Sequence, residues 1–388
     1  MRTMHPVLKR GGLYWDRALL PPSAYEARFR NVQRAIAASG DDAWLVYGDV
    51  ETYGALAWFS NFLPRTRSAL ALVPREGAPT LLLSVGLRDV PAAKTLTWID
   101  DARPFTRLPR TLVGLIEEKR LASARIGLAC VEELLPIKDW NEISKALPNA
   151  HFVSRTRALS DLRARKDDCE IEAVRRAAKI VSGALDLFAN ALKPGLAMRA
   201  ATAQVDRYLR ANGAEDLRIM VAGGEQTGAS LRPADDRVLK QGDAILLYVA
   251  AETQRYWAEG ARTFVLGAAS EAQRRLAANA ETALAAMRAA IKPGVTAASI
   301  ARAGEDTLAN DVLRASARGY GFGDGIGLDL AEAPSFTSDE SMVEASTFAL
   351  RVIAHADGMG VALGETIILR DGAIERLIEA PGLVERSP

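Results

Sequence analysis

The sequence predicts an α/β domain over residues 1–158 and an α+β domain with an internal repeat over residues 159–388. Three observations lead to this prediction. The chain has 388 residues, which is too long for one ordinary hydrophobic core. Its first part alternates short apolar strands with amphipathic helices, which is typical of an α/β layer. Its second part contains two similar segments, each of which continues into glycine-rich strands.

Apolar spacing and turn residues predict the elements of the first domain. Residues 23–39 have a helical period of apolar side chains, with Ser23 as an N-cap and Gly40 as a stop. The apolar segments 69–73 and 80–84 flank a Pro- and Gly-containing turn and predict a hairpin. The remaining expected elements are strands at 43–47, 125–129 and 151–153 and helices at 112–119 and 134–147.

A long helix over residues 166–192 is expected to open the second domain. It ends in Leu192-Lys-Pro-Gly195, and the same ending recurs at Ile291-Lys-Pro-Gly294. Chance recurrence of a common helix terminator is one explanation, since Pro and Gly end many helices. The helical periods that flank both copies favour the other explanation, a pseudo-twofold domain with a cleft between its halves.

Composition excludes several classes of partner. The chain carries 49 Lys plus Arg against 48 Asp plus Glu, a formal net charge of +1. This balance predicts no nucleic acid and no membrane surface as partner. Cys130 and Cys169 form no CxxC pair, and the chain has no signal-peptide pattern and no apolar run long enough to span a bilayer. We therefore expect a soluble, cytoplasmic protein.

Several motifs occur in the order and spacing of a known family. They include Asp42-Ala-Trp-Leu-Val-Tyr47 and Trp58-Phe-Ser-Asn-Phe62 in the first domain, and Gly242-Asp243, Gly325-Ile-Gly327 and Glu365-Thr366 in the second. In these motifs the chain resembles the creatinase, prolidase and Xaa-Pro aminopeptidase family. The resemblance implies a pita-bread carboxy-terminal domain with a pseudo-twofold repeat, preceded by a creatinase-type α/β amino-terminal domain. It also implies a homodimer, or a heterodimer with a paralogue.

The metal-ligand positions of that family are substituted here. Its metallopeptidases use two Asp, one His and two Glu. The corresponding positions hold Tyr248, Glu259, Asp324, either Arg351 or Val352, and Gly364. Two divalent ions about 3.5–4 Å apart need bridging carboxylates to offset their repulsion. Only two carboxylates remain, so we expect neither a bound metal nor another cofactor. The alternative is a single Mg²⁺ held by Glu259 and Asp324.

The polar residues that remain suggest acid/base chemistry. Glu259 and Asp324 in one pocket are candidates for general acid and general base, and Tyr248 for a hydrogen-bond donor to an oxyanion. Arginines such as Arg262 are suited to bind a substrate carboxylate. The predicted catalytic residues are Tyr248, Glu259, Asp324 and Glu365, and the predicted substrate-binding residues are Arg65, Arg262, Glu332, Arg351 and His355.

These residues also have purely structural explanations. Tyr248 on an apolar strand is typical of a core residue, and Glu259 with Arg262 is consistent with a structural ion pair. The three histidines, His5, His151 and His355, are typical of tails and loops, and only His355 is expected near the site. The segment 227–233 has no histidine, so the acid/base residue of creatinase has no counterpart there.

The sequence therefore predicts a metal-independent enzyme that acts on a small organic molecule by acid/base catalysis, either a hydrolase of a C–N bond or a lyase. One alternative is a metallopeptidase of the Xaa-Pro type, for which the ligands are missing. The other alternative is a non-catalytic binding protein with the same fold.

Overall fold

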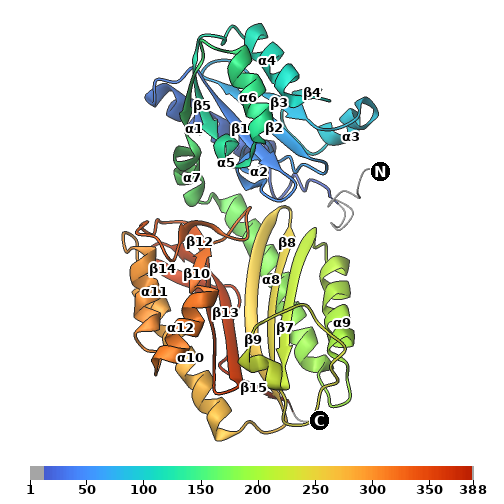
Figure 1. The fold of residues 1–388 in the computed structure, drawn as a ribbon, viewed down its shortest axis with the longest axis vertical. Helices are drawn as coiled ribbons and strands as arrows, with labels where there is room; N and C mark the ends of the chain where they lie inside the picture. Colours follow the sequence, from blue (N-terminus) through green and yellow to red (C-terminus); the bar gives the residue numbers. More distant parts are fainter. Residues whose placement is uncertain (1–12, 387–388) are drawn as a thin grey trace. The chain divides into compact units, whose positions relative to one another are not determined.

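The computed structural model describes residues 13–386, so His5 lies outside the described residues. The chain divides into two compact units, Met1–Arg163 and Ala164–Pro388 (Figure 1). The division falls at the end of helix α7 (Thr156–Ala164), whereas the predicted boundary after residue 158 lies inside the same helix. None of the helices in residues 13–386 combines the length and apolar character needed to cross a bilayer.

The amino-terminal unit is built on a six-stranded mixed sheet in the order β4-β3-β2-β1-β5-β6. The expected hairpin is confirmed as an antiparallel pair, while β1 pairs with β5 in parallel. The strands are β1 (Ala43–Asp49), β2 (Ser68–Pro74), β3 (Thr80–Leu83), β4 (Asp101–Pro104), β5 (Arg125–Ala129) and β6 (His151–Ser154). The helices are α1 (Pro22–Ala38), α2 (Gly54–Ser60), α3 (Val90–Lys94), α4 (Leu108–Glu118), α5 (Val131–Leu134) and α6 (Ile137–Ala146).

The carboxy-terminal unit combines long helices with a nine-stranded sheet. Its helices are α8 (Asp168–Ala191), α9 (Met198–Ala211), α10 (Glu271–Ala290), α11 (Ala297–Glu305) and α12 (Asp311–Tyr320). Its strands are β7 (Asp216–Gly223), β8 (Ala244–Thr253), β9 (Tyr256–Leu266), β10 (Gly323–Gly325), β11 (Glu332–Ser335), β12 (Ser346–Ala356), β13 (Met359–Arg370), β14 (Ala373–Arg376) and β15 (Val384–Arg386).

The predicted repeat is confirmed. The main strand order β11-β10-β12-β13-β9-β8-β7 has β13 and β9 at its centre, one from each half. Each half begins with a long helix, α8 or α10, followed by a Lys-Pro-Gly turn and a shorter helix, α9 or α11. Gly195 and Gly294 close these turns with φ values of 83° and 82°, a left-handed conformation that favours glycine.

Alternation along the strands decides which side chains meet the helices. In β8, Ile245, Leu247, Val249 and Ala251 belong to the core that contains α8. In β12, Phe348, Leu350, Val352 and Ala354 belong to the core that contains α10. Because successive side chains on a strand point to opposite faces, the residues between them lie on the other face of the sheet. We call that other face the site face.

Candidate active site

Four of the predicted residues meet on the site face. Tyr248 lies on β8, Glu259 on β9, Asp324 on β10 and Arg351 on β12. Tyr248 and Arg351 each lie between residues that pack against the helices, so strand alternation turns both to the site face. The four side chains form one connected set of hydrogen bonds and ion pairs. We refer to these four residues as the cluster.

Glu259 is the centre of the cluster and is 1% exposed. The Tyr248 hydroxyl donates a hydrogen bond to Glu259 Oε2 over 2.6 Å. Arg351 Nη1 donates to Glu259 Oε1 over 2.8 Å. Both carboxylate oxygens are therefore satisfied, as burial of a charged group requires.

Arg351 joins the two carboxylates. Its Nη2 donates to Asp324 Oδ2, and its Nε donates to the Tyr320 carbonyl over 3.5 Å. Burial lowers the pKa of the Arg351 guanidinium, but the adjacent charges of Glu259 and Asp324 raise it by more, so the pKa lies above the ordinary arginine value. Val352 packs in the core that contains α10, so Arg351, and not Val352, is the residue on the site face.

The Tyr248 hydroxyl is held in its protonated form. Burial, the negative charge of Glu259 and the hydrogen bond to Glu259 together raise the pKa of Tyr248 well above its ordinary value. The hydroxyl already donates a hydrogen bond to Glu259, so Tyr248 is a partner of that carboxylate and not an unengaged donor to an oxyanion.

Replacing Tyr248 by Phe should lower the free energy of unfolding by about 1–2 kcal/mol at neutral pH, because Glu259 loses a donor. The folded-state pKa is raised, so this contribution is fully present below about pH 10 and is lost as pH rises through the folded pKa. Chemical unfolding of both proteins between about pH 7 and pH 11 measures the difference. A difference that does not shrink at the alkaline end would contradict this assignment.

Two predicted residues lie on the helix face of the sheet instead. Glu365 is fully buried there, where it accepts hydrogen bonds from Arg288 Nη1 over 3.0 Å and from Arg376. Arg262 Nη1 donates to Asp186 of α8 over 2.5 Å. Alternation explains both corrections: Gly364, not Glu365, shares the site face with Arg351, and Arg262 is an odd number of residues from Glu259. The suggested Glu259–Arg262 ion pair is therefore wrong.

Two further predicted residues of the carboxy-terminal unit have other surroundings, and a third belongs to the amino-terminal unit. Glu332 forms an ion pair of 2.6 Å with Lys166. His355 lies at the end of β12, four residues from Arg351 and thus about 13 Å along the strand. Arg65 belongs to the amino-terminal unit, where it lines a pocket.

Sequence reasoning missed the threonines that join the two halves beside Glu259. Thr366 Oγ1 accepts the Glu259 N–H over 3.0 Å and donates to the Glu259 carbonyl over 2.7 Å. Thr263 Oγ1 bridges the Ala362 N–H and carbonyl in the same way, over 2.8 and 3.0 Å. These hydroxyls replace backbone bonds between β9 and β13, which share only the pair Gly364 and Ala261. The motif Glu365-Thr366 could have indicated Thr366, because this threonine directly follows a predicted site residue.

The cluster does not fit a pair of divalent metals. It offers two carboxylates, and a guanidinium already holds both of them. Because this guanidinium already contacts the carboxylate oxygens, its positive charge would repel two divalent metal ions bound to the same oxygens. Within residues 13–386, no group of three or more His, Cys, Asp or Glu side chains is placed to hold a metal ion. We therefore derive no chemical step through a metal.

A sheet of two related halves with a polar cluster beside their junction defines the pita-bread class of protein. A family model described as metallopeptidase family M24 matches residues 172–371, and the creatinase/prolidase amino-terminal domain matches residues 28–165. The chain belongs to metallopeptidase family M24 and has the creatinase-type two-domain architecture.

The chain is similar to named proteins over most of its length. A Sinorhizobium fredii protein described as an uncharacterized hydrolase/peptidase is 25% identical over 83% of this chain and 85% of its own length. The Xaa-Pro dipeptidase of Pyrococcus horikoshii is 26% identical over 64% of this chain and 72% of its own length. The crystal structure of the X-Pro aminopeptidase from Thermotoga maritima superimposes with a TM-score of 0.82 at 22% identity, covering 93% of this chain and 99% of that chain.

These comparisons contradict the predicted metal-independent hydrolase or lyase. The family is one of metallopeptidases, and the similar proteins from two Pyrococcus species are described as Xaa-Pro dipeptidases. They support an enzyme of the peptidase class and favour the alternative of an Xaa-Pro peptidase. The prediction relied on the lost ligands and on the acid/base residues that remain, and neither observation by itself specifies a different substrate class.

Proposed function

We propose that this chain acts on short peptides of the Xaa-Pro type, and that it binds them at the cluster. The observation that carries the proposal is the family match over residues 172–371, a range that contains all four cluster residues. The names of the relatives from Pyrococcus species support the substrate class.

The charges of the cluster suit one end of such a peptide. Two carboxylates face one guanidinium, so the cluster carries one excess negative charge. Asp324 is 17% exposed in its side chain and uses only Oδ2 for Arg351, which leaves Oδ1 without a partner among residues 13–386. An ammonium group is the natural partner for that oxygen, because charge-assisted hydrogen bonds are the strong ones. We assign Asp324 to the terminal ammonium of the peptide.

Hydrolysis of Ala-Pro, with Pro-Ala as the reversed sequence, tests this proposal in the presence of added Mn²⁺ and in the presence of chelator. We expect the chain to hydrolyse Ala-Pro and not Pro-Ala. The rate of Ala-Pro hydrolysis should fall roughly 100-fold or more in Asp324→Asn, since a hydrogen-bonded charge pair with the substrate is lost. Asp311→Asn is the matched control, because that carboxylate is 96% exposed. Failure to hydrolyse Ala-Pro under both conditions would refute the peptidase proposal.

A second candidate is a non-catalytic protein that binds the same peptides. The position of Arg351 between Glu259 and Asp324 favours it, because the guanidinium lies where the family's metallopeptidases carry ligands. Calorimetry with Ala-Pro distinguishes the two candidates. Binding of one equivalent without turnover, weakened in Asp324→Asn, would support the second candidate. Absence of both binding and turnover would contradict both.

The assembly and location of the protein remain predictions. The family resemblance led us to expect a homodimer, or a heterodimer with a paralogue, in the cytoplasm. The mass of the purified chain in light scattering tests the homodimer directly, and a mass of one chain would contradict it.

A further inference from the structure

The amino-terminal unit contains a pocket that the proposed function does not use. It has a volume of about 600 Å³, within the range of small-molecule sites. Its apolar lining includes Phe62, Val85, Ala93, Leu96 and Phe105. Every residue that lines the pocket belongs to the amino-terminal unit, and none of the four cluster residues lines it.

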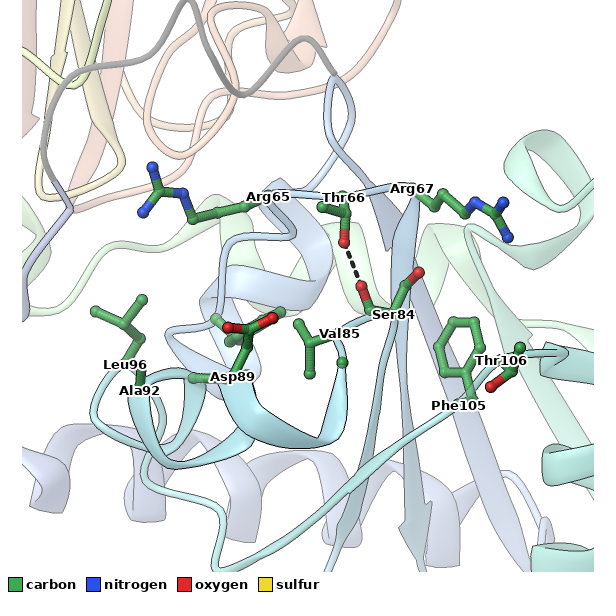
Figure 2. Close-up of a pocket in the computed structure, with 13 residues that line it drawn as sticks. Arg65, Thr66, Arg67, Ser84, Val85, Asp89, Ala92, Leu96, Phe105 and Thr106 are labelled. Carbon is green, nitrogen blue, oxygen red and sulfur yellow. Dashed lines mark hydrogen bonds between the residues drawn. The ribbon is translucent and has the colours of Figure 1, made fainter. Parts of the chain in front are cut away.

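The polar groups of the pocket are largely unused. Arg65 and Arg67 form no ion pair or side-chain hydrogen bond with residues 13–386, and Figure 2 shows them extending to opposite sides of Thr66. The hydroxyls of Ser84 and Thr106 likewise lack a partner among the described residues. Asp89 is the one acidic residue among those that line this pocket. Two guanidinium groups against one carboxylate leave the pocket with an excess of positive charge.

The segment that carries the arginines is held in a specific conformation. Arg67 has a φ of 48°, in the left-handed region that is unfavourable for a non-glycine residue. The Thr66 hydroxyl donates to the Ser84 carbonyl and so ties this segment to the chain beyond β3 (Figure 2). Backbone conformations of this kind persist where the surroundings enforce them and often occur at binding sites.

We propose that this pocket binds a small monocarboxylate with an apolar body. The carboxylate would accept hydrogen bonds from Arg67 and from the hydroxyls of Ser84 and Thr106. The apolar body would lie against Phe105, Val85 and Leu96. Arg67 contributes more than Arg65, because Figure 2 shows Arg67 on the same side of Thr66 as Phe105 and Thr106, whereas Arg65 extends to the other side.

Isothermal titration of the full chain with 4-phenylbutyrate and with its neutral amide, 4-phenylbutyramide, tests this proposal. We expect one equivalent of the carboxylate to bind, and the amide to bind at least about tenfold more weakly. Arg67→Gln should weaken carboxylate binding by roughly threefold to fivefold, and Arg65→Gln by less. Higher salt should weaken it as well, since the arginines are exposed.

Two more variants separate the pocket from a general surface effect. Ala92→Trp places a large side chain into the pocket from an exposed position, and should abolish binding while leaving the far-ultraviolet circular dichroism unchanged. Arg275→Gln is the charge-matched control, because Arg275 is 69% exposed and belongs to the carboxy-terminal unit. No binding to the wild-type chain, equal binding of acid and amide, or the same affinity in Ala92→Trp would each overturn the proposal.

Discussion

Replacing Arg351 by Met is expected to lower the free energy of unfolding by about 3–5 kcal/mol, because removal of one partner leaves buried charge without compensation. Glu259 is almost fully buried and receives Arg351 Nη1 over 2.8 Å, so the variant keeps a carboxylate from which water is excluded. Asp324 loses the guanidinium that donates to its Oδ2 at the same time. Tyr248 alone remains as a donor to Glu259.

Chemical unfolding followed by circular dichroism measures the effect. Arg275→Met is the matched control, since its i,i+4 pair with Glu271 is exposed and such pairs contribute only about 0.3–0.5 kcal/mol. The double variant Arg351→Met/Glu259→Gln should recover part of the loss, because the amide carries no charge. A loss below about 1 kcal/mol in Arg351→Met would show that the cluster is solvated and not a buried ion-pair network.

The fold was predictable because its signals are local and repeated. The long helix α8 begins at a capping box, in which Asp167 and Glu170 satisfy each other's backbone N–H groups, and its apolar residues keep the helical period over 24 residues. The two Lys-Pro-Gly turns mark equivalent points of the two halves, and both their glycines are left-handed. Such patterns depend on neighbours in the chain, so they can be read without knowing the tertiary structure.

The site was predictable only in part, because its membership depends on strand register. Alternation would have decided between Arg351 and Val352, since Phe348, Leu350 and Val352 form one apolar stripe. The same argument would have moved Glu365 to the helix face with Arg288. The partners themselves could not be predicted, because Arg288 and Glu365 are 77 residues apart and meet only through packing of α10 on the sheet.

Because of Arg351, the family match indicates the fold of this chain more strongly than its chemistry. A metallopeptidase model matches residues 172–371, a range that runs from α8 to the end of β13. Ligand identity involves few positions and contributes little to such a match. The fold and family therefore follow from many residues, whereas the proposed site rests on four side chains, among which the Arg351 guanidinium pairs with both Glu259 and Asp324.

Replacing Lys166 by Met is the other change with a large expected effect, a loss of about 3–5 kcal/mol in the free energy of unfolding. Lys166 and Glu332 form an ion pair of 2.6 Å in which the side chains are 4% and 6% exposed. Glu332 Oε1 also accepts the Asp329 N–H over 3.0 Å. Without Lys166, a nearly buried carboxylate would keep its charge and lose its cationic partner.

The pair also supports the Gly325-Ile-Gly327 turn that follows Asp324. A Cβ on Gly327 would lie 2.9 Å from Glu332 Oε1 and 3.0 Å from Lys166 Cε, so the ion pair packs directly on this glycine. The Gly327 carbonyl accepts the Trp257 N–H over 2.7 Å and thereby connects the turn to β9. In Lys166→Met we therefore expect faster hydrogen exchange of the Trp257 amide, beyond any change at strands of the amino-terminal unit.

Lys179→Met is the control, because that lysine is exposed on α8. Combining Lys166→Met with Glu332→Gln should recover part of the stability, since the pair then carries no net charge. The affinity for Ala-Pro in Glu332→Gln separates structure from binding. If Glu332 contacted the peptide, as the sequence suggested, affinity would fall while stability held. If the ion pair instead positions the turn, Glu332→Gln should lower the stability, and the folded fraction should keep nearly the same affinity for Ala-Pro.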